Sequence, residues 1–293
     1  MTDTQPVRGL SAPKTPLPAD SWECHSHVFG PFDRYPLDPG CAYQPPFGPL
    51  AHYRAMLDMA GFAYGVAIHA SANGFDNDCV RDAAKSAPGK IRFVGVPSPD
   101  TPESEMSALV ADGMCGIRIT EVGPSYGGPK RVGVLGLEDF KTSAPAMAEL
   151  GLYASIWAKA DYLAQERAYL ETAPVPVVLD HMGNFDPARG VGDDSFKAIL
   201  GMLGSGNVWV KLTAQRTSGE AWDVCENVRA FHDALLSVAP DRCLFGSDWP
   251  YIMMDKNLPD IGGQIDLFDA WVADETLRRK VFVDNPRALH GIA

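Results

Sequence analysis

The 293-residue sequence contains no apolar run that approaches the roughly 20 residues needed to cross a bilayer as a helix. Its N-terminal 20 residues are polar and rich in proline, without the apolar core of a signal peptide. We therefore expect a cytoplasmic protein with no membrane partner. The sequence does not indicate an oligomeric state.

Closely spaced cysteines and excess basic charge are also missing. The six cysteines show no CxxC spacing, and most lie in apolar segments, where cysteine behaves as a small hydrophobic residue. We expect reduced thiols and no zinc-thiolate site. The formal net charge of −12 opposes binding to nucleic acid. A small anionic substrate is still compatible with this charge, because salt screens charges beyond about 8 Å.

What the sequence does contain is a regular alternation of strand-like and helix-like segments. The β-rich runs cover residues 22–29, 65–70, 92–98, 115–120, 152–158, 175–182, 208–213 and 243–249. Segments with helical periodicity separate them. This order predicts parallel strands joined by right-handed crossovers, closed into a single-domain (β/α)8 TIM-type barrel over residues 21–293, after an N-terminal arm over 1–20. An open Rossmann-like sheet is the alternative, but no GxGxxG follows the first run.

Polar residues that suit catalysis gather at three of the predicted strand ends, which is where such barrels place their active sites. His25 and His27 close the first run, and because their spacing is i, i+2 they should point to the same side of the strand. His181 ends the sixth run, and Asp248 ends the eighth. A carboxylate beside imidazoles in a water-poor barrel mouth can serve as a general base, and imidazole N–H groups can stabilise an oxyanion.

These motifs resemble the amidohydrolase superfamily, whose barrels carry HxH after strand one and Asp after strand eight. The resemblance is closest to the lactonase branch typified by 2-pyrone-4,6-dicarboxylate lactonase. It is carried by HSHVFGP (25–31), GIR (116–118), VPVVLDHMG (175–183) and GSDWP (246–250). The resemblance implies that Asp248 takes a proton from the attacking water and that His25, His27 and His181 surround the lactone carbonyl. It also implies a barrel of the distorted amidohydrolase variety.

The resemblance bears on the cofactor as well. Dinuclear members bridge two metal ions with a Lys or Glu after strand four and add a His after strand five, whereas these strands here end in Arg118-Ile119-Thr120 and Ile156-Trp157-Ala158. Since the lactonase branch works without metal, we expect no cofactor. One zinc ion is the alternative, and its ligands would be His25, His27, His181 and Asp248.

Arginines at strand ends indicate the substrate class. Arg118 ends the fourth run, Arg131 lies in the following loop, and Arg216 follows the seventh run. A guanidinium fork matches a carboxylate in two-point geometry, and the corresponding arginines of the lactonase hold substrate carboxylates. Tyr43, in a long loop over 30–50 that should cover the barrel mouth, and Ser71 are further candidate contacts to substrate.

Two positions depart from the lactonase pattern and bear on the substrate. Asn184 replaces an arginine after HMG, and Trp157 replaces a tyrosine in strand five. We expect a hydrolase that opens a small carboxylated lactone, either 2-pyrone-4,6-dicarboxylate-like or muconolactone-like, sulfonated muconolactone included. The alternatives are a sugar-acid lactonase and a metal-dependent decarboxylase or hydratase of the same superfamily.

Overall fold

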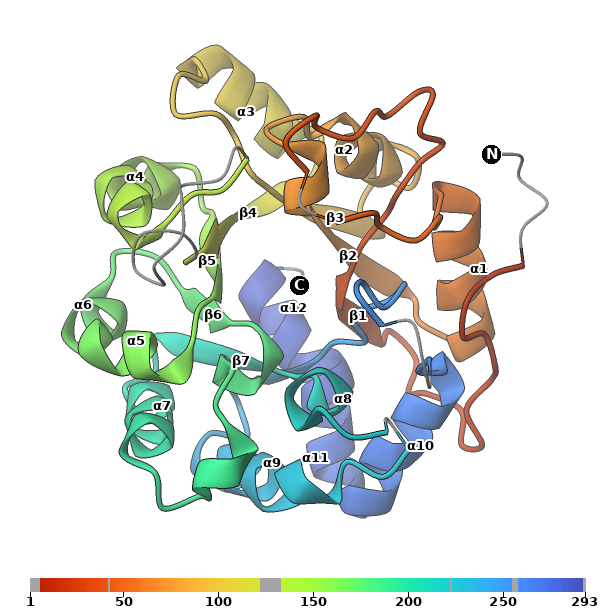
Figure 1. The fold of residues 1–293 in the computed structure, drawn as a ribbon, viewed down its shortest axis with the longest axis vertical. Coiled ribbons are helices and arrows are strands. Elements are labelled where there is room, and N and C mark those ends of the chain that lie inside the picture. The colour runs from red at the N-terminus through yellow and green to blue at the C-terminus, as the bar shows by residue number, and fades with distance from the viewer. Residues whose placement is uncertain (1–5, 42, 122–132, 222, 255–257, 292–293) are drawn as a thin grey trace.

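The barrel predicted from the sequence is confirmed. The computed structural model describes residues 6–41, 43–121, 133–221, 223–254 and 258–291. Eight parallel strands follow one another in chain order, with helices around them (Figure 1). The strands are Trp22–Ser26 (β1), Tyr64–Ile68 (β2), Ile91–Gly95 (β3), Met114–Thr120 (β4), Tyr153–Trp157 (β5), Val177–Leu179 (β6), Val208–Leu212 (β7) and Cys243–Phe245 (β8).

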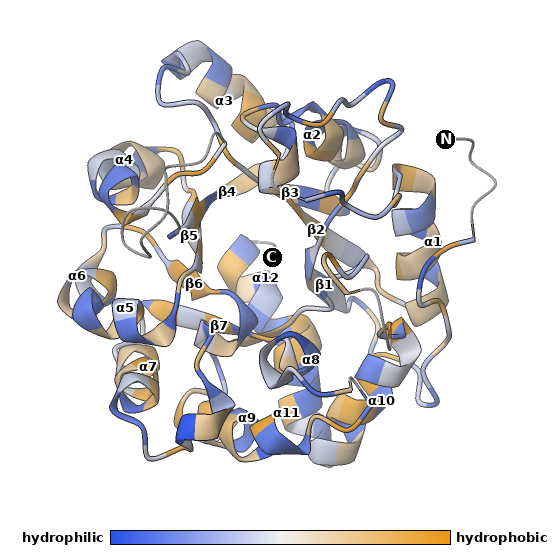
Figure 2. Cartoon of the chain, viewed as in Figure 1, coloured by the Kyte–Doolittle hydropathy of each residue, from blue (hydrophilic) through white to orange (hydrophobic). Residues whose placement is uncertain are grey.

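Most of the helices surround the barrel, where an amphipathic helix can bury its apolar face, while α12 lies at the closed end (Figure 1). The colours of Figure 2 show hydrophobic and hydrophilic stretches alternating along them. The α-helices are Leu50–Ala60 (α1), Asp78–Lys85 (α2), Glu103–Ala111 (α3), Leu137–Glu149 (α4), Ala160–Gln165 (α5), Arg167–Thr172 (α6), Asp194–Gly204 (α7), Ala214–Ser218 (α8), Glu226–Val238 (α9), Ile261–Trp271 (α10), Glu275–Arg279 (α11) and Asn285–His290 (α12). Single turns form at Ser71–Asn73 (η1), His181–Gly183 (η3), Pro187–Arg189 (η4) and Lys280–Asp284 (η5). Among the described residues, no helix is both long and apolar enough to cross a membrane.

The seam between β1 and β8 closes at the end where the strands finish. Ser26 pairs with Trp249 in an isolated bridge, and the His27 amide donates to the Trp249 carbonyl at 2.7 Å. The Asp248 amide donates to the His25 carbonyl, also at 2.7 Å. These bonds place the residues after β8 directly beside the histidines of β1.

The opposite end of the barrel is apolar and covered. Trp22, the first residue of β1, stacks on His290 of α12 with ring centroids 4.8 Å apart. An interior cluster of residues including Cys24, Val94 and Leu244 fills the space above it. The open end of the barrel is therefore the end that carries the predicted site.

Two chain segments outside the barrel pack on it. In the predicted N-terminal arm, the Gly9 carbonyl accepts from the Ile261 amide at 3.0 Å, and a Cβ on Gly262 would lie 2.5 Å from the Ala12 carbonyl oxygen. Residues 9–14 thus lie along α10, and the carbonyls of Thr15 and Pro16 accept from Arg278 of α11. The long loop after β1 is anchored by an antiparallel bridge between Phe29 and Gly48, and it reaches the barrel mouth as predicted.

Candidate active site

A β-bulge in β1 turns His25 into the barrel. The pairing register between β1 and β2 shifts between Glu23 and Ser26. Cys24 packs in the interior apolar cluster, and the adjacent His25 contacts Lys211 of β7, the second strand from β1 past the β8 seam. Strict alternation would place neighbours on opposite faces, so the bulge is what brings His25 inside. Gly246 makes room for it, because a Cβ there would lie 2.7 Å from the Cβ of His25.

Asp248 lies against both histidines of the HxH motif. Its Oδ1 is 3.3 Å from His27 Nε2 and 3.6 Å from His25 Nε2. The other ring nitrogen of His27 faces the Ile68 carbonyl at 2.8 Å, and since a carbonyl only accepts, His27 Nδ1 carries a proton. A neutral His27 therefore turns a lone pair toward Asp248.

His181 completes this group from η3. Its ring lies 4.7 Å from the His25 ring, and its Nδ1 is buried without a hydrogen-bond partner in the described structure. Both His181 (φ 50°) and Asp248 (φ 59°) adopt left-handed backbone conformations. Such conformations cost non-glycine residues roughly 1–3 kcal/mol and cluster at functional sites.

Burial and charge set the protonation of this group. Burial alone would raise the pKa of Asp248, but the Arg216 guanidinium and the imidazoles of His181 and His27 hold it well below its usual range. Burial lowers the pKa of His181 to about 4 and also lowers the pKa of His25 and of His27. An ionised carboxylate among neutral imidazoles results at neutral pH.

Below this group lies a buried ion pair that the sequence analysis missed. Lys211 Nζ is 2.9 Å from Asp180 Oδ1 and 3.0 Å from Ser155 Oγ, which itself donates to Asp180 at 2.8 Å. Burial would raise the pKa of Asp180, but Lys211 and His25 keep it well below its usual range. A lysine inside the otherwise apolar run VWVKLT was the signal for this pair.

Glu23 is a second buried carboxyl that the sequence analysis did not single out. It accepts from the Ser247 amide at 2.8 Å, the Ser247 hydroxyl at 3.0 Å and the Ser26 hydroxyl at 2.5 Å. Burial raises its pKa despite these bonds. Glu23 thereby ties β1 to the segment that carries Asp248.

Two of the three predicted arginines lie at the same end of the barrel as Asp248. Arg216 Nε lies 3.4 Å from Asp248 Oδ2, and its NH1 donates to the Ile252 carbonyl at 2.6 Å. Arg118 NH1 donates to the His69 carbonyl at 3.1 Å, while its Nε is buried without a partner in the described structure. Arg131 lies outside the described residues.

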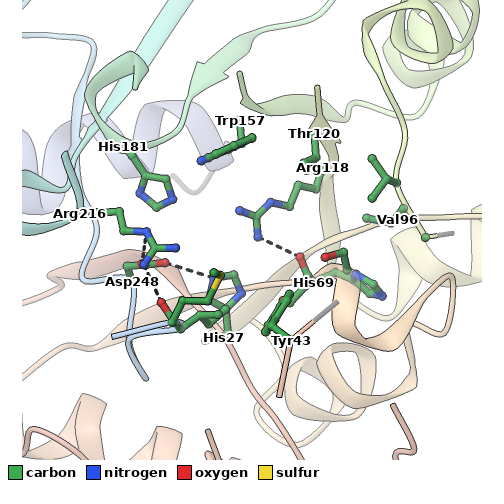
Figure 3. A pocket seen from close by; sticks show the side chains of 16 residues that line it. His27, Tyr43, His69, Val96, Arg118, Thr120, Trp157, His181, Arg216 and Asp248 are labelled. Carbon is green, nitrogen blue, oxygen red and sulfur yellow. Dashed lines mark hydrogen bonds and ion pairs between the residues drawn. The ribbon is translucent and has the colours of Figure 1, made fainter. Parts of the chain in front are cut away.

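These side chains line a pocket of about 150 Å³ at the barrel mouth. Asp248, Arg216 and His27 lie on one side of it and Arg118 and Tyr43 on the other (Figure 3). The lining residues are His27, Tyr43, His69, Ala70, Ser71, Val96, Arg118, Thr120, Gly133, Val134, Trp157, His181, Arg216, Asp248, Ile252 and Met253.

Not every predicted site residue lines this pocket. His25 is fully buried behind Asp248 and is not part of the lining. Asn184 is in the left-handed turn that ends η3, where its amide donates to the His181 carbonyl at 2.8 Å. His69, which follows β2, also lines the pocket, and its Nε2 faces the Asp76 carbonyl at 3.0 Å.

The donor atoms of the site decide whether it can hold a metal ion. The ligand atoms of His25, His181 and Asp248 lie within 4.8 Å of one another. However, Lys211 Nζ lies 3.0 Å from His25 Nδ1, and a protonated lysine can only donate there. A His25 proton on Nε2, the atom nearest Asp248, would leave that nitrogen without a lone pair for zinc, and in that tautomer the cluster does not fit the ion. Glu121 follows β4, where dinuclear members of the superfamily carry a bridging Lys or Glu. Here it accepts a hydrogen bond from the Leu137 amide at 2.8 Å and is not part of the pocket lining.

Comparison with known proteins identifies the family of the chain. The amidohydrolase family model matches residues 22–292. The chain belongs to this family. The predicted resemblance is therefore confirmed, and the protein is a hydrolase.

Individual relatives match over nearly the whole chain. A 4-sulfomuconolactone hydrolase from Rhizobium radiobacter is 31% identical over 98% of this chain and 96% of its own. A 2-pyrone-4,6-dicarboxylate hydrolase from Comamonas testosteroni is 30% identical over 96% of this chain and 93% of its own. The solved apo structure of ATU3138 from Agrobacterium tumefaciens superposes with a TM-score of 0.85, at 23% identity and 99% coverage of both chains.

Proposed function

We propose that this amidohydrolase opens a small anionic lactone, with Asp248 as general base and without a metal ion. One observation carries the proposal. Asp248 and the imidazoles of His27 and His181 face the same pocket as the guanidinium groups of Arg118 and Arg216. A base and two anion-binding forks in one space suit an acyl substrate that bears negative groups.

In the proposed reaction, water attacks the ring carbonyl and loses a proton to Asp248. His27 Nε2 lies 3.3 Å from the receiving oxygen and also has a lone pair, so the two groups can share the proton. The new C–O bond forms, the ring C–O bond breaks, and the ring oxygen leaves as an enol or alcohol. An N–H of His181 aimed at the carbonyl oxygen would stabilise the oxyanion by roughly 3 kcal/mol.

Substrate binding would also activate the base. Arg216 helps to keep the pKa of Asp248 low, and a carboxylate of the substrate would compete for this guanidinium. As Arg216 turns to the substrate, the proton affinity of Asp248 rises. An anionic substrate would thus strengthen the base that acts on it, whereas a neutral lactone would not.

The relatives support a carboxylate or sulfonate as the anionic group, since one is named for 4-sulfomuconolactone and the other for 2-pyrone-4,6-dicarboxylate. Trp157 and Asn184 replace the tyrosine and arginine of the pyrone lactonase pattern, so one charge and one hydroxyl are lost. This difference favours a muconolactone-like ring, sulfonated or carboxylated, over the pyrone dicarboxylate itself.

A pH-stat assay over a lactone panel tests the substrate class. The panel should hold sulfonated and carboxylated muconolactones, 2-pyrone-4,6-dicarboxylate, a sugar-acid lactone and a neutral lactone of similar size. We expect acid release with the anionic muconolactones and little with the neutral ring. If the sugar-acid lactone alone is turned over, the substrate proposal is wrong.

Prolonged chelation tests the metal-free proposal. Dialysis against a chelator should leave turnover unchanged, because in the proposed reaction the Asp248 carboxylate takes the proton and an imidazole N–H stabilises the oxyanion, so that neither step needs a metal ion. Metal analysis of the same sample gives the control. Activity that disappears and returns only with a divalent ion would make the imidazoles ligands and overturn this part of the proposal.

A further inference from the structure

Lys211 is a lysine whose charged end group lies buried inside the barrel. It projects from β7 and is 1% exposed, in the layer between the apolar end of the barrel and the pocket. Its ammonium has three N–H donors and three acceptors around it. These are Asp180 Oδ1 at 2.9 Å, Ser155 Oγ at 3.0 Å and His25 Nδ1 at 3.0 Å.

The contact with His25 determines where the imidazole holds its proton. An ammonium has no lone pair, so it can bond to Nδ1 only if Nδ1 accepts. Asp180 Oδ1 also lies near this nitrogen, but at 3.3 Å, and it already receives hydrogen bonds from Ser155 and Lys211. Because the contact of Nδ1 with Lys211 is shorter than its contact with Asp180, we infer that Nδ1 accepts from Lys211 and that the ring proton is on Nε2.

The proton on Nε2 has a consequence for Asp248. Nε2 is buried, has no hydrogen-bond partner in the described structure, and lies 3.6 Å from Asp248 Oδ1. A zinc ion would require a lone pair at this atom, and the N–H would then face the ammonium of Lys211. Two donors would point at each other across 3.0 Å.

We propose that Lys211 is a positioning residue that holds His25 as the Nε2–H tautomer. His25 then offers a hydrogen-bond donor to the catalytic carboxylate and is prevented from ligating a metal. Lys211, with Asp180 as its counter-ion, would in this way keep an amidohydrolase HxH motif free of zinc. The catalytic part of this inference rests on the proposed function, but the tautomer itself does not.

The imidazole nitrogen resonances of a sample labelled with ¹⁵N-histidine give the direct test, with His25 assigned by its loss in a His25→Asn variant. We expect the parent protein to show a protonated, pyrrole-type Nε2 and an unprotonated, pyridine-type Nδ1 for His25 at neutral pH. In Lys211→Met the proton should move to Nδ1, where Asp180 is the remaining acceptor. A protonated Nδ1 in the parent, or an unchanged tautomer in Lys211→Met, would overturn the proposal.

Zinc binding supplies a second readout that needs no substrate. Titration with zinc alone should show that Lys211→Met binds the ion at least about 10-fold more tightly than the parent, a change of the size seen when outer-shell partners are altered. Lys197→Met, which removes an exposed lysine of α7, is the matched control and should bind zinc as the parent does. Equal affinity in Lys211→Met and the parent would contradict the proposal.

Lys211→Gln serves if Lys211→Met does not fold, because its amide oxygen can accept from a protonated Nδ1 while its amide nitrogen donates to Asp180. It should show the same change of tautomer and the same gain in zinc affinity. Because both readouts are independent of turnover, a failure of the lactone assays would leave this inference standing, and the reverse also holds.

Discussion

The two sides of the pocket are built differently. The reaction wall consists of His27, His181 and Asp248, with His25 buried behind Asp248, and the recognition wall consists of Tyr43, Ser71, Arg118 and Trp157. The reaction wall comes from strand ends and from turns directly after strands, and Asp248 is 2% exposed. The recognition wall draws Tyr43 from the long loop after β1 and Ser71 from η1, and the Arg118 side chain is 12% exposed.

This contrast teaches how the barrel separates chemistry from specificity. The reaction wall is braced by buried bonds from Glu23 and Lys211, so its geometry depends on the barrel itself. The recognition wall can change through its loops without moving the base. Substitutions in the reaction wall should therefore reduce turnover for every substrate, whereas those in the recognition wall should act on some substrates and not on others.

The largest effect is expected from Asp248→Asn, which removes the base and keeps the shape. Turnover should fall by at least about 100-fold, in the range usual for a lost general base. Initial rates on the best lactone measure this, and circular dichroism checks that the fold is retained. Near-normal turnover in Asp248→Asn would remove Asp248 from the mechanism.

A selective effect is expected from Arg118→Ala in the recognition wall. Arg118 lines the pocket, and its NH2 is 3.8 Å from Asp180 Oδ2, so a substrate carboxylate can become a closer partner of this guanidinium. We expect kcat/KM to fall by about 100-fold for an anionic lactone, because the substrate charge is left unpaired in a largely buried pocket. Arg118→Lys should also be poor, since an ammonium lacks the two-point fork.

The matched control for Arg118 is Arg34→Ala, which removes an exposed arginine paired with Asp82. It should behave as the parent on every substrate. A neutral lactone should be hydrolysed slowly, and equally, by the parent and by Arg118→Ala. Unchanged kcat/KM for the anionic lactone in Arg118→Ala would make this residue part of the framework and refute its role in recognition.

A smaller effect concerns stability against acid. Burial lowers the pKa of His69 and of His181 from the ordinary value of 6.5 to about 4. Between pH 6.5 and 4 the unfolded chain therefore binds more protons than the folded one, so the free energy of unfolding is highest above pH 6.5 and falls as the pH drops through this window. Each group should cost about 2 kcal/mol at pH 5, which urea unfolding at pH 7 and pH 5 measures.

His290→Phe provides the comparison for this pH dependence. Burial lowers the pKa of His290 to about 3, and its ring stacks on Trp22 at the apolar end of the barrel. Phenylalanine can keep the stacking and has no group to protonate, so the loss of stability between pH 7 and pH 5 should become smaller. If the parent protein is equally stable at both pH values, the pKa values of the buried histidines are not lowered in the folded protein, and the prediction is wrong.

Much of the site could be predicted because it follows the barrel order. The strand ends place His27, His181, Asp248, Arg118 and Arg216 around one mouth, and periodicity with strand order suffices for that. Helix faces follow less directly from the sequence, since Val238, the apolar last residue of α9, is 46% exposed.

Other parts of the site depend on geometry that no pattern shows. The bulge that turns His25 inward is a local change of register, and the i, i+2 spacing alone does not reveal it. Lys211 and Asp180 are 31 residues apart and meet only when β6 and β7 pair around the closed barrel. Glu23 likewise gains its role from Ser247, at the other end of the chain.

The central claim is that water attacks the carbonyl of a lactone, and oxygen labelling tests it most directly. The protein should be incubated with an anionic muconolactone in H₂¹⁸O, and the product examined by mass spectrometry. We predict one ¹⁸O atom in the newly formed carboxylate for each turnover, with a rate that falls in Asp248→Asn. Product formed without ¹⁸O would show isomerisation or elimination in place of hydrolysis and would contradict the account.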